Sequence, residues 1–261
     1  MGTVWITGAS SGIGKACALR YASMGRSLVL TSSSREKLEA VAEECRHLGA
    51  PQASVLPYDF RNPDGLEDLV EEAWNVSGGI DILFCNAGVS QRTTVLDTSI
   101  ETVRELMEIN YFAPVRMAKA ILPHMLDAGG GTIAVTSSIA GRFGFPLRCA
   151  YSSSKHALYG FFETLRAEYY SKGIRVTIVC PGRVRTDISL NARDKGGKPH
   201  GVMDPGQASG LSPEKAARRI VRAIGRGRRE VLIGRGELLM VQIKRFFPGL
   251  CAWIGRHIKA V

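Results

Sequence analysis

Short apolar runs rich in β-branched residues alternate along this chain with longer segments of helical periodicity. Each run is apolar at successive positions rather than at every second one, which is typical of strands buried on both faces of a sheet. The pattern predicts strands at Thr3–Thr7, Ser27–Thr31, Ala53–Pro57, Ile80–Cys85, Thr132–Thr136, Ile174–Cys180 and Glu230–Ile233. It predicts helices near residues 12–24, 35–48, 63–77, 100–126, 151–172 and 212–225.

Strands that alternate with helices form a parallel sheet with helices on both faces. The predicted fold is α/β, a single-domain Rossmann-like doubly wound sheet of about seven strands, with ligands at the C-terminal strand ends. The domain is expected to cover residues 1–235, and residues 236–261 to form an extension of it. Residues 189–210 lack clear periodicity, and so long a loop in a compact domain predicts a substrate lid.

The composition is that of an ordinary globular protein, with 45% hydrophobic and 22% charged residues among 261. It excludes a disordered chain, a collagen and a disulfide-held scaffold. The six cysteines include no CxxC pair and no Cys/His cluster at zinc spacing, which predicts reduced thiols and no metal site. Reduced thiols without a secretory leader indicate a cytoplasmic location.

The formal net charge of +10 lies almost wholly near the C-terminus. Residues 211–261 carry twelve Lys and Arg against three Glu, whereas residues 1–210 are close to neutral. This distribution, together with the lack of a nucleic-acid-binding motif, predicts no nucleic-acid partner. The basic segment could instead serve an anionic membrane surface, an anionic ligand or solubility.

A glycine-rich turn, Thr7-Gly8-Ala9-Ser10-Ser11-Gly12-Ile13-Gly14, follows the first predicted strand and opens a helix. Glycines let such a turn approach a pyrophosphate, which the free N–H groups and dipole of the helix N-terminus stabilise. The pattern predicts a dinucleotide site, and a purely structural turn is the alternative. The predicted ligand-binding residues of this turn are Gly8, Ser10, Ser11, Gly12, Ile13 and Gly14.

The end of the second predicted strand bears on the choice of coenzyme. An NAD enzyme would place Asp or Glu there to bind the ribose 2′-hydroxyl, but this chain has Ser33, Ser34 and Arg35. Hydroxyls and a guanidinium suit a 2′-phosphate, so NADP(H) is predicted as the preferred cofactor, with NAD(H) not excluded. The alternative is that Ser34 caps the next helix and Arg35 is solvated.

Tyr151 and Lys155 are four residues apart and therefore share one face of a helix. Ser138 closes the strand before that helix. Because strand ends meet at one edge of a parallel sheet, the hydroxyl and the phenol are expected beside the predicted nucleotide site.

In these residues the chain resembles the short-chain dehydrogenase/reductase family. The resemblance covers nearly the whole chain and rests on motifs in the family's order: Thr7–Gly14, Asp59, Asn86-Ala87-Gly88, Asn110, Ser138, Tyr151 with Lys155, and Pro181-Gly182. It implies that Tyr151 is the general acid or base and that Ser138 orients the substrate oxygen. Lys155 would hold the nicotinamide ribose and stabilise phenolate, and Asn110 would anchor a water for proton transfer.

The same resemblance implies the rest of the cofactor site and an oligomer. Asp59 and Phe60 would lie near the adenine, and Asn86, Ala87 and Gly88 along the cofactor. The nicotinamide amide would be held by Pro181, Gly182, Val184 and Thr186. A homodimer or homotetramer would pack through the helices near residues 100–126 and 151–172.

The substrate is expected to be a small carbonyl compound or alcohol. Gly201-Val202-Met203-Asp204 and Gly210-Leu211-Ser212-Pro213 resemble the branch of dehydrogenase/reductase members 7 and 7B. That resemblance implies a lipophilic substrate such as a steroid, a retinoid or an acyl-lipid ketone. Apolar candidates for its pocket are Phe143, Phe145, Pro146, Leu147 and Ile188, and burial in the core is their alternative role.

Residues 236–261 mix large apolar side chains with basic ones. Their longest uncharged apolar run is too short to cross a bilayer and contains Pro248-Gly249. The segment could make a peripheral membrane contact as a basic amphipathic segment, or could pack over the substrate pocket or a subunit interface.

The sequence thus predicts an NADP(H)-dependent oxidoreductase that interconverts a carbonyl and a secondary alcohol by hydride transfer. One alternative keeps this chemistry but acts on small polar ketones. Another is a catalytically silent NADP-binding sensor or scaffold, which the complete set of Asn110, Ser138, Tyr151 and Lys155 disfavours.

Overall fold

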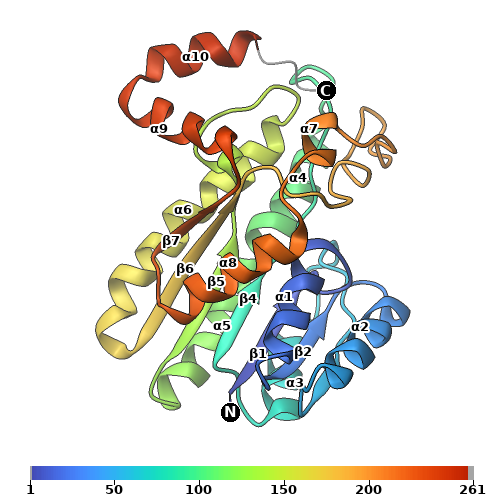
Figure 1. Cartoon of the computed structure of the whole chain (residues 1–261), viewed down its shortest axis with the longest axis vertical. Coiled ribbons are helices and arrows are strands. Elements are labelled where there is room, and N and C mark those ends of the chain that lie inside the picture. The colour runs from blue at the N-terminus through green and yellow to red at the C-terminus, as the bar shows by residue number, and fades with distance from the viewer. Residues whose placement is uncertain (1, 258–261) are drawn as a thin grey trace.

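A seven-stranded, fully parallel sheet forms the centre of the structure, a computed structural model that describes residues 2–257 (Figure 1). Its strands are β1 (Thr3–Thr7), β2 (Ser27–Thr31), β3 (Ala53–Val55), β4 (Ile82–Cys85), β5 (Gly131–Thr136), β6 (Ile174–Pro181) and β7 (Glu230–Ile233). They lie in the order β3-β2-β1-β4-β5-β6-β7. The strand order therefore reverses between β1 and β4, where doubly wound sheets bind ligands. The predicted fold class is confirmed.

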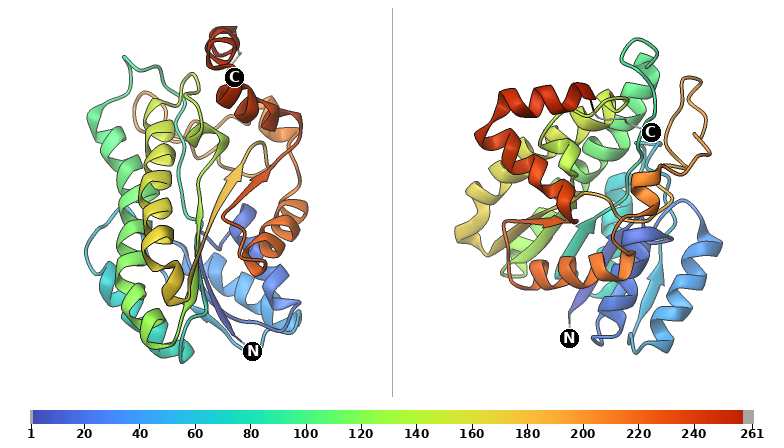
Figure 2. Two further views of the ribbon diagram at one scale, coloured as in Figure 1. Left: turned by 90° about the vertical axis from the view of Figure 1, so that its left-hand side faces the viewer. Right: turned by 45° about the horizontal axis from the view of Figure 1, so that its top comes forward.

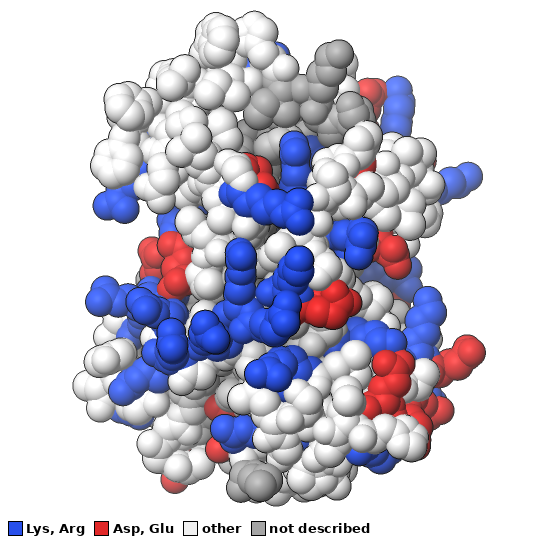
Figure 3. Space-filling model, in the orientation of Figure 1, with Lys and Arg blue, Asp and Glu red and all other residues white. Residues whose placement is uncertain are grey.

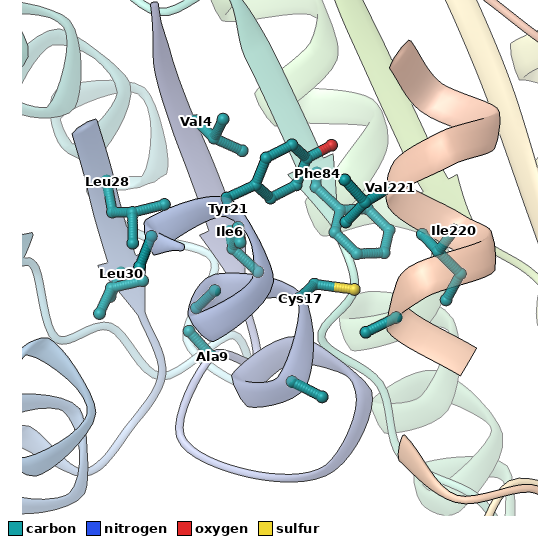
Figure 4. Close-up of a cluster of buried hydrophobic side chains, with 14 of the residues drawn as sticks. Val4, Ile6, Ala9, Cys17, Tyr21, Leu28, Leu30, Phe84, Ile220 and Val221 are labelled. Atoms are coloured by element: carbon teal, nitrogen blue, oxygen red, sulfur yellow. The ribbon is translucent and has the colours of Figure 1, made fainter. Parts of the chain in front are cut away.

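Helices cover both faces of the sheet (Figure 2). One face packs against α1 (Gly12–Ala22), α2 (Arg35–His47) and α8 (Pro213–Gly225). The other packs against α3 (Leu66–Ser77), α5 (Ala113–Asp127) and α6 (Cys149–Tyr169). Figure 4 shows the first of these cores, in which side chains of α1 and α8 meet those of β1, β2 and β4. Burial on both faces explains why the strands are apolar at successive positions.

The predicted helix over residues 100–126 has a change of winding in its middle. It consists of α4 (Ile100–Met107), a π-helical segment over Glu108–Phe112, and α5. Single π turns of this kind occur frequently at functional sites, and this one carries Asn110. The helix predicted over 151–172 begins at Cys149, two residues earlier than expected, and ends in a 3-10 turn over Tyr170–Lys172.

The predicted lid, residues 189–210, contains the short helix α7 (Pro205–Ala208) and is tied to the loop that follows β4. Arg193 N–H donates to Ser90 O, and Arg92 N–H donates to Arg193 O, both at 2.8 Å. The guanidinium of Arg193 also forms an ion pair with Glu105 of α4. The lid is therefore docked against the body of the domain.

Residues 239–257 form a helical hairpin of α9 (Leu239–Phe246) and α10 (Pro248–His257) beyond the sheet (Figure 1). Residues 258–261 of the predicted extension lie outside the described residues. Within residues 2–257, every helix is too short or too polar to span a membrane.

Candidate functional site

A cavity of about 940 Å³ opens at the C-terminal ends of the strands. Most of the predicted site residues line it: Gly8, Ser10, Ser11, Gly12, Ile13, Ser33, Asp59, Phe60, Asn86, Ala87, Gly88, Ser138, Tyr151, Lys155, Pro181, Gly182, Val184 and Thr186. Gly14, Ser34, Arg35 and Asn110 are not among its lining residues. The cavity thus joins the glycine-rich turn to the Tyr151–Lys155 pair.

The glycine-rich turn needs its glycines for two different reasons. Gly8 and Gly12 have φ of 64° and 55°, in the left-handed region that glycine adopts without strain. Gly14 is required by close packing, since a Cβ there would lie 2.1 Å from Gly8 O. The N-cap Ser11 makes no side-chain hydrogen bond to the first turn of α1. The first N–H groups of α1 therefore suit a phosphate, and the turn fits a dinucleotide.

Hydrogen bonds fix the strand ends beneath this turn. Thr7 Oγ1 accepts the backbone N–H groups of Asn86 and Ala87, each at 3.0 Å. The Asn86 amide donates to Thr7 O at 3.2 Å and accepts from Thr136 Oγ1 at 3.2 Å. Asn86 thereby links β1, β4 and β5, and its side chain has a structural role in the cavity floor.

Two of the residues after β2 interact with their own helix α2 and do not line the cavity. Ser34 Oγ accepts the Lys37 N–H at 3.3 Å and so caps α2. Arg35 has a side chain that is 64% exposed and lies 3.6 Å from Glu39. Ser33 lines the cavity. Of the three predicted coenzyme-selecting residues, Ser33 alone borders the cavity.

Asp59, predicted near the adenine, is held by its neighbour Arg61. The Arg61 Nε donates to both carboxylate oxygens at 3.0 Å. The hydrogen bond from Arg61 outweighs the effect of burial and lowers the pKa of Asp59. The pair lines the cavity, and its carboxylate stays ionised there.

Asn110 is almost fully buried and braces the wall next to Lys155. Its Oδ1 accepts the Val89 N–H at 2.9 Å, and its Nδ2 donates to Val89 O at 2.9 Å and to Ser154 Oγ at 3.0 Å. A Cβ on Gly88 would lie 3.0 Å from Asn110 Oδ1 and 3.3 Å from Lys155 Nζ. Asn110, Gly88 and Lys155 are therefore in one tight cluster.

Burial shifts the pKa values of Tyr151 and Lys155 in opposite directions. It lowers the pKa of Lys155 to about 7, and the Lys155 Nζ donates to Thr136 O at 2.8 Å. It raises the pKa of the Tyr151 phenol, an effect opposed by the hydrogen bond with Ser138 and by the charges of Arg92 and Arg148. Near neutral pH the phenol therefore keeps its proton and can donate it.

Gln91, which the sequence reasoning missed, positions the first turn of α6. The side chain of Arg148, the N-cap residue, makes no capping hydrogen bond to this helix. Instead the fully buried Gln91 accepts the Tyr151 N–H on its Oε1 at 3.1 Å. Its Nε2 donates to Thr93 Oγ1 at 2.9 Å and to Thr98 Oγ1 at 2.8 Å. The backbone of Tyr151 is thus held by a residue 60 positions away.

A second missed feature is a buried group of charges in the cavity wall. The Asp204 carboxylate of the lid accepts the Arg92 Nε at 3.0 Å and Arg148 at 3.0 Å. Burial would raise the pKa of Asp204, but the hydrogen bond and charge of Arg92 and the charge of Arg148 keep it below its usual value. Burial, with the charge of Arg92, lowers the pKa of Arg148 to about 10.

Another part of the cavity wall is apolar. Phe143, Phe145 and Ile188 line it, as predicted for the substrate side, whereas Pro146 and Leu147 do not. Leu147 has a φ of 62°, a strained value for a branched residue, and its carbonyl accepts the Thr93 N–H at 3.2 Å. The hairpin adds Met240 and Ile254 to the lining. The cavity therefore combines a polar cofactor end with a chamber in which an apolar wall stands beside the charges of Arg92, Arg148 and Asp204.

Fold and site together define an oxidoreductase of the kind that uses a nicotinamide cofactor. The family model for short chain dehydrogenases matches residues 2–196. This chain belongs to the short-chain dehydrogenase/reductase family, as the resemblance of its motifs implied.

Within that family, the chain is similar to the branch of members 7 and 7B. It is 38% identical over 253 residues to dehydrogenase/reductase SDR family member 7B of Xenopus laevis. The aligned region covers 95% of this chain and 78% of that protein. It is 36% identical over 255 residues to dehydrogenase/reductase SDR family protein 7-like of Drosophila melanogaster, covering 96% of this chain and 78% of that protein.

Solved structures show the same fold. A short chain dehydrogenase/reductase from Burkholderia phymatum in complex with NAD has a TM-score of 0.84 at 25% identity, over 95% of this chain and 94% of that one. A short-chain dehydrogenase from Sphingobium yanoikuyae in complex with NADPH has a TM-score of 0.80 at 26% identity, over 97% and 96% of the two chains. These relatives support a nicotinamide cofactor, with either coenzyme represented.

Proposed function

We propose that this chain is an NADP(H)-dependent oxidoreductase that interconverts a carbonyl group and a secondary alcohol on a lipophilic substrate. The observation that carries the proposal is that Tyr151, Ser138 and Lys155 line one cavity together with the glycine-rich turn. In this proposal residues 1–235 are the cofactor-binding domain, residues 189–210 its substrate loop, and residues 236–261 an extension that borders the chamber through Met240 and Ile254.

The cofactor, when bound, supplies or accepts a hydride at its nicotinamide ring. The first turn of α1, Gly8 and Gly12 would hold its phosphates, while Pro181 and Thr186 would border the nicotinamide end. Lys155, in its charged form, would donate hydrogen bonds to the ribose hydroxyls and would favour the phenolate form of Tyr151.

Tyr151 acts as general acid during carbonyl reduction and as general base during alcohol oxidation. Its phenol is protonated near neutral pH, as an unperturbed tyrosine is, and burial raises its pKa further. In reduction it donates that proton to the substrate oxygen as negative charge develops there. Ser138 donates a hydrogen bond to the same oxygen and orients it, and Asn110 anchors a water that returns a proton to Tyr151 from solvent.

A lipophilic substrate is supported by the apolar chamber wall of Phe143, Phe145, Ile188, Met240 and Ile254. Burying apolar surface contributes about 25 cal/mol per Å² to binding, which favours a long or polycyclic ketone over a small one. The second candidate, a reductase of small polar ketones, is favoured by a different observation. Arg92, Arg148 and Asp204 also line the chamber and could accept a polar group.

Preference for NADP(H) is supported by the first four residues after β2, Ser32 to Arg35, which include no carboxylate; Ser32 and Ser33 line the cavity. A carboxylate there would bind the 2′-hydroxyl of NAD and repel the 2′-phosphate of NADP. A homodimer or homotetramer packed through α4, α5 and α6, a cytoplasmic location and a peripheral membrane contact through the C-terminal segment complete the proposal.

The test is a paired titration of the purified chain with NADPH and NADH, followed by a turnover scan over ketones graded from small and polar to long-chain and steroidal. The proposal expects tighter binding of NADPH and kcat/KM rising along the apolar series. The highest kcat/KM on the smallest polar ketone would favour the second candidate. Tight cofactor binding without turnover of any ketone would favour a silent sensor and contradict the catalytic role.

A further inference from the structure

The C-terminal hairpin exposes large apolar side chains on its outer side. Leu239, Phe246, Phe247, Leu250 and Trp253 are exposed by 63%, 63%, 63%, 46% and 57%. We call these five residues the outer face of the hairpin. Isolated exposed apolar residues are normal, but five within fifteen residues of two adjoining helices mark a contact surface.

The inner side of the same hairpin already serves the fold. Met240, Val241, Ile243 and Cys251 pack with Phe143 and neighbouring residues beneath the hairpin. Met240 and Ile254 line the cavity. Since the inner residues account for how the hairpin is held, the exposed aromatic residues of the outer face are not needed for folding.

Basic side chains, without acidic ones, accompany the outer face. Lys244, Arg245 and Arg256 lie on α9 and α10, and Glu237 is the last acidic residue of the sequence. The Arg245 guanidinium carbon lies 5.4 Å from the centre of the Phe246 ring. Figure 3 shows the surface over the hairpin as mainly uncharged, with a dense band of Lys and Arg below it over α8.

We propose that the outer face of the hairpin docks on a lipid bilayer that carries anionic headgroups. Aromatic rings and leucines suit the boundary between headgroups and acyl chains, and lysine and arginine suit anionic phosphates. A second copy of the chain fits less well, because residues 239–257 carry Lys244, Arg245 and Arg256 but no carboxylate that could pair with them in a contact between two hairpins.

Docking would also give the chamber a route to its substrate. Ile254 lines the cavity and is the residue next to the exposed Trp253. If Trp253 lies in the bilayer, the adjacent wall of the chamber therefore lies close to the lipid. A lipophilic ketone dissolved in the bilayer would then enter without crossing water. This route rests on the proposed function. Docking assigns a surface and a lipid to the membrane contact proposed above, does not depend on the catalytic role, and is measured separately below.

Trp253 provides a direct probe of docking. Of the other two tryptophans, Trp5 is fully buried in the sheet and Trp74 is half-buried on α3. Full-length protein is mixed with phosphatidylcholine vesicles with or without about 30 mol% phosphatidylserine. Docking predicts a blue shift of the tryptophan emission and quenching by brominated lipids, both stronger with phosphatidylserine. Trp253→Phe should lose the spectral change yet still sediment with vesicles.

A matched set of variants identifies the surface responsible. Phe246→Ser/Phe247→Ser/Trp253→Ser should lower vesicle partitioning at least about 10-fold, and Lys244→Glu/Arg245→Glu should abolish the phosphatidylserine preference. Val95→Ser/Leu96→Ser, at residues that are 78% and 95% exposed elsewhere, should leave partitioning unchanged. Retained NADPH binding shows that each variant is folded.

Two results would overturn the proposal: no partitioning of the wild type into either vesicle, or equal loss in the Val95/Leu96 control. A blue shift that grows with protein concentration in the absence of vesicles would instead assign the face to a second copy. Partitioning without turnover of any ketone would leave docking intact and contradict only the proposed function.

Discussion

At the residue scale, burial of Tyr151 and Lys155 shifts the pKa of each so that its uncharged form is favoured. Tyr151 and Lys155 are both buried, with 8% and 3% of their surface exposed. Desolvation disfavours the charged form of each, so the phenol keeps its proton and the ammonium loses part of its charge near pH 7. Two titratable groups whose environments set their protonation in this way are typical of acid–base sites.

Replacing Tyr151 by Phe removes the proposed proton donor and little else. We expect kcat to fall by a factor of about 10²–10⁴, the usual contribution of general acid catalysis, with the NADPH Kd within a few-fold of the wild type. Tyr159→Phe is the control. Tyr159 also lies on α6, but its hydroxyl donates to Glu230 Oε1 at 2.8 Å, and Tyr159 does not line the cavity. Parallel loss of cofactor affinity in Tyr151→Phe would contradict the assignment.

Lys155 predicts a pH dependence of cofactor binding. In the free protein its pKa is lowered to about 7 by burial, and bound ribose hydroxyls and phosphates would favour the charged form and raise that pKa. Binding then takes up a proton above pH 7, so affinity should fall as pH rises from 7 to the pKa of the complex. Calorimetry in buffers of different ionisation enthalpy measures the uptake. Lys155→Met should show a flat profile, and a wild-type profile equally flat would refute the linkage.

Local signals in the sequence are sufficient to single out candidate residues whose role is local. The glycines of the phosphate turn and the Tyr151–Lys155 spacing were found because neighbours along the chain are sufficient to recognise them. Ser34 shows the limit, since an N-cap and a coenzyme contact demand the same kind of side chain, and the structure gives Ser34 the cap. Gln91 and Tyr151 could not be connected, because no local pattern links residues 60 positions apart.

At the scale of elements, the strands were the most predictable part. Thr3–Thr7, Ser27–Thr31 and Glu230–Ile233 match the predicted bounds, because buried parallel strands are apolar at successive positions. The π-helical segment at Glu108–Phe112 was not visible, since one wider turn leaves the periodicity on either side almost unchanged. The two helices of the α9–α10 hairpin were not predicted either. Apolar residues lie on both its inner and its outer face, so the sequence shows no clear helical periodicity there.

The N-terminus of α6 is where an element and the chemistry meet. Gln91→Leu leaves the buried Tyr151 N–H without its acceptor, which should lower the free energy of unfolding by about 1–3 kcal/mol. The first turn then loosens, so kcat should fall while the NADPH Kd stays close to wild type. Denaturant unfolding and steady-state kinetics measure the two effects. The control Gln52→Leu changes an exposed glutamine that bonds Ser54 and Val76, and unchanged kcat in both variants would rule out positioning by Gln91.

At the scale of the whole molecule, the lid is joined to the domain by residues far apart in sequence. Arg92 and Asp204 are 112 positions apart, and both side chains are over 90% buried. The contact between the lid and the loop after β4 therefore contains an ion pair shielded from solvent. Residues 189–210 are visible in the sequence as a loop without periodicity, but no local pattern identifies Arg92 as the partner of Asp204.

Asp204→Asn should show how strongly the lid depends on this pair. The change leaves Arg92 and Arg148 facing a neutral amide, and loss of one partner from a buried pair costs about 3–5 kcal/mol. We expect the free energy of unfolding to fall by up to about that amount. Proteolysis within residues 189–210 should become faster, and the KM for the ketone should rise. Asp97→Asn is the matched control, because its partner Lys195 is 78% exposed and such surface pairs contribute about 0–1 kcal/mol. Equal small effects of the two changes would mean that the lid is held by its backbone bonds and by the Arg193–Glu105 pair, and that Asp204 contributes no more than a surface charge.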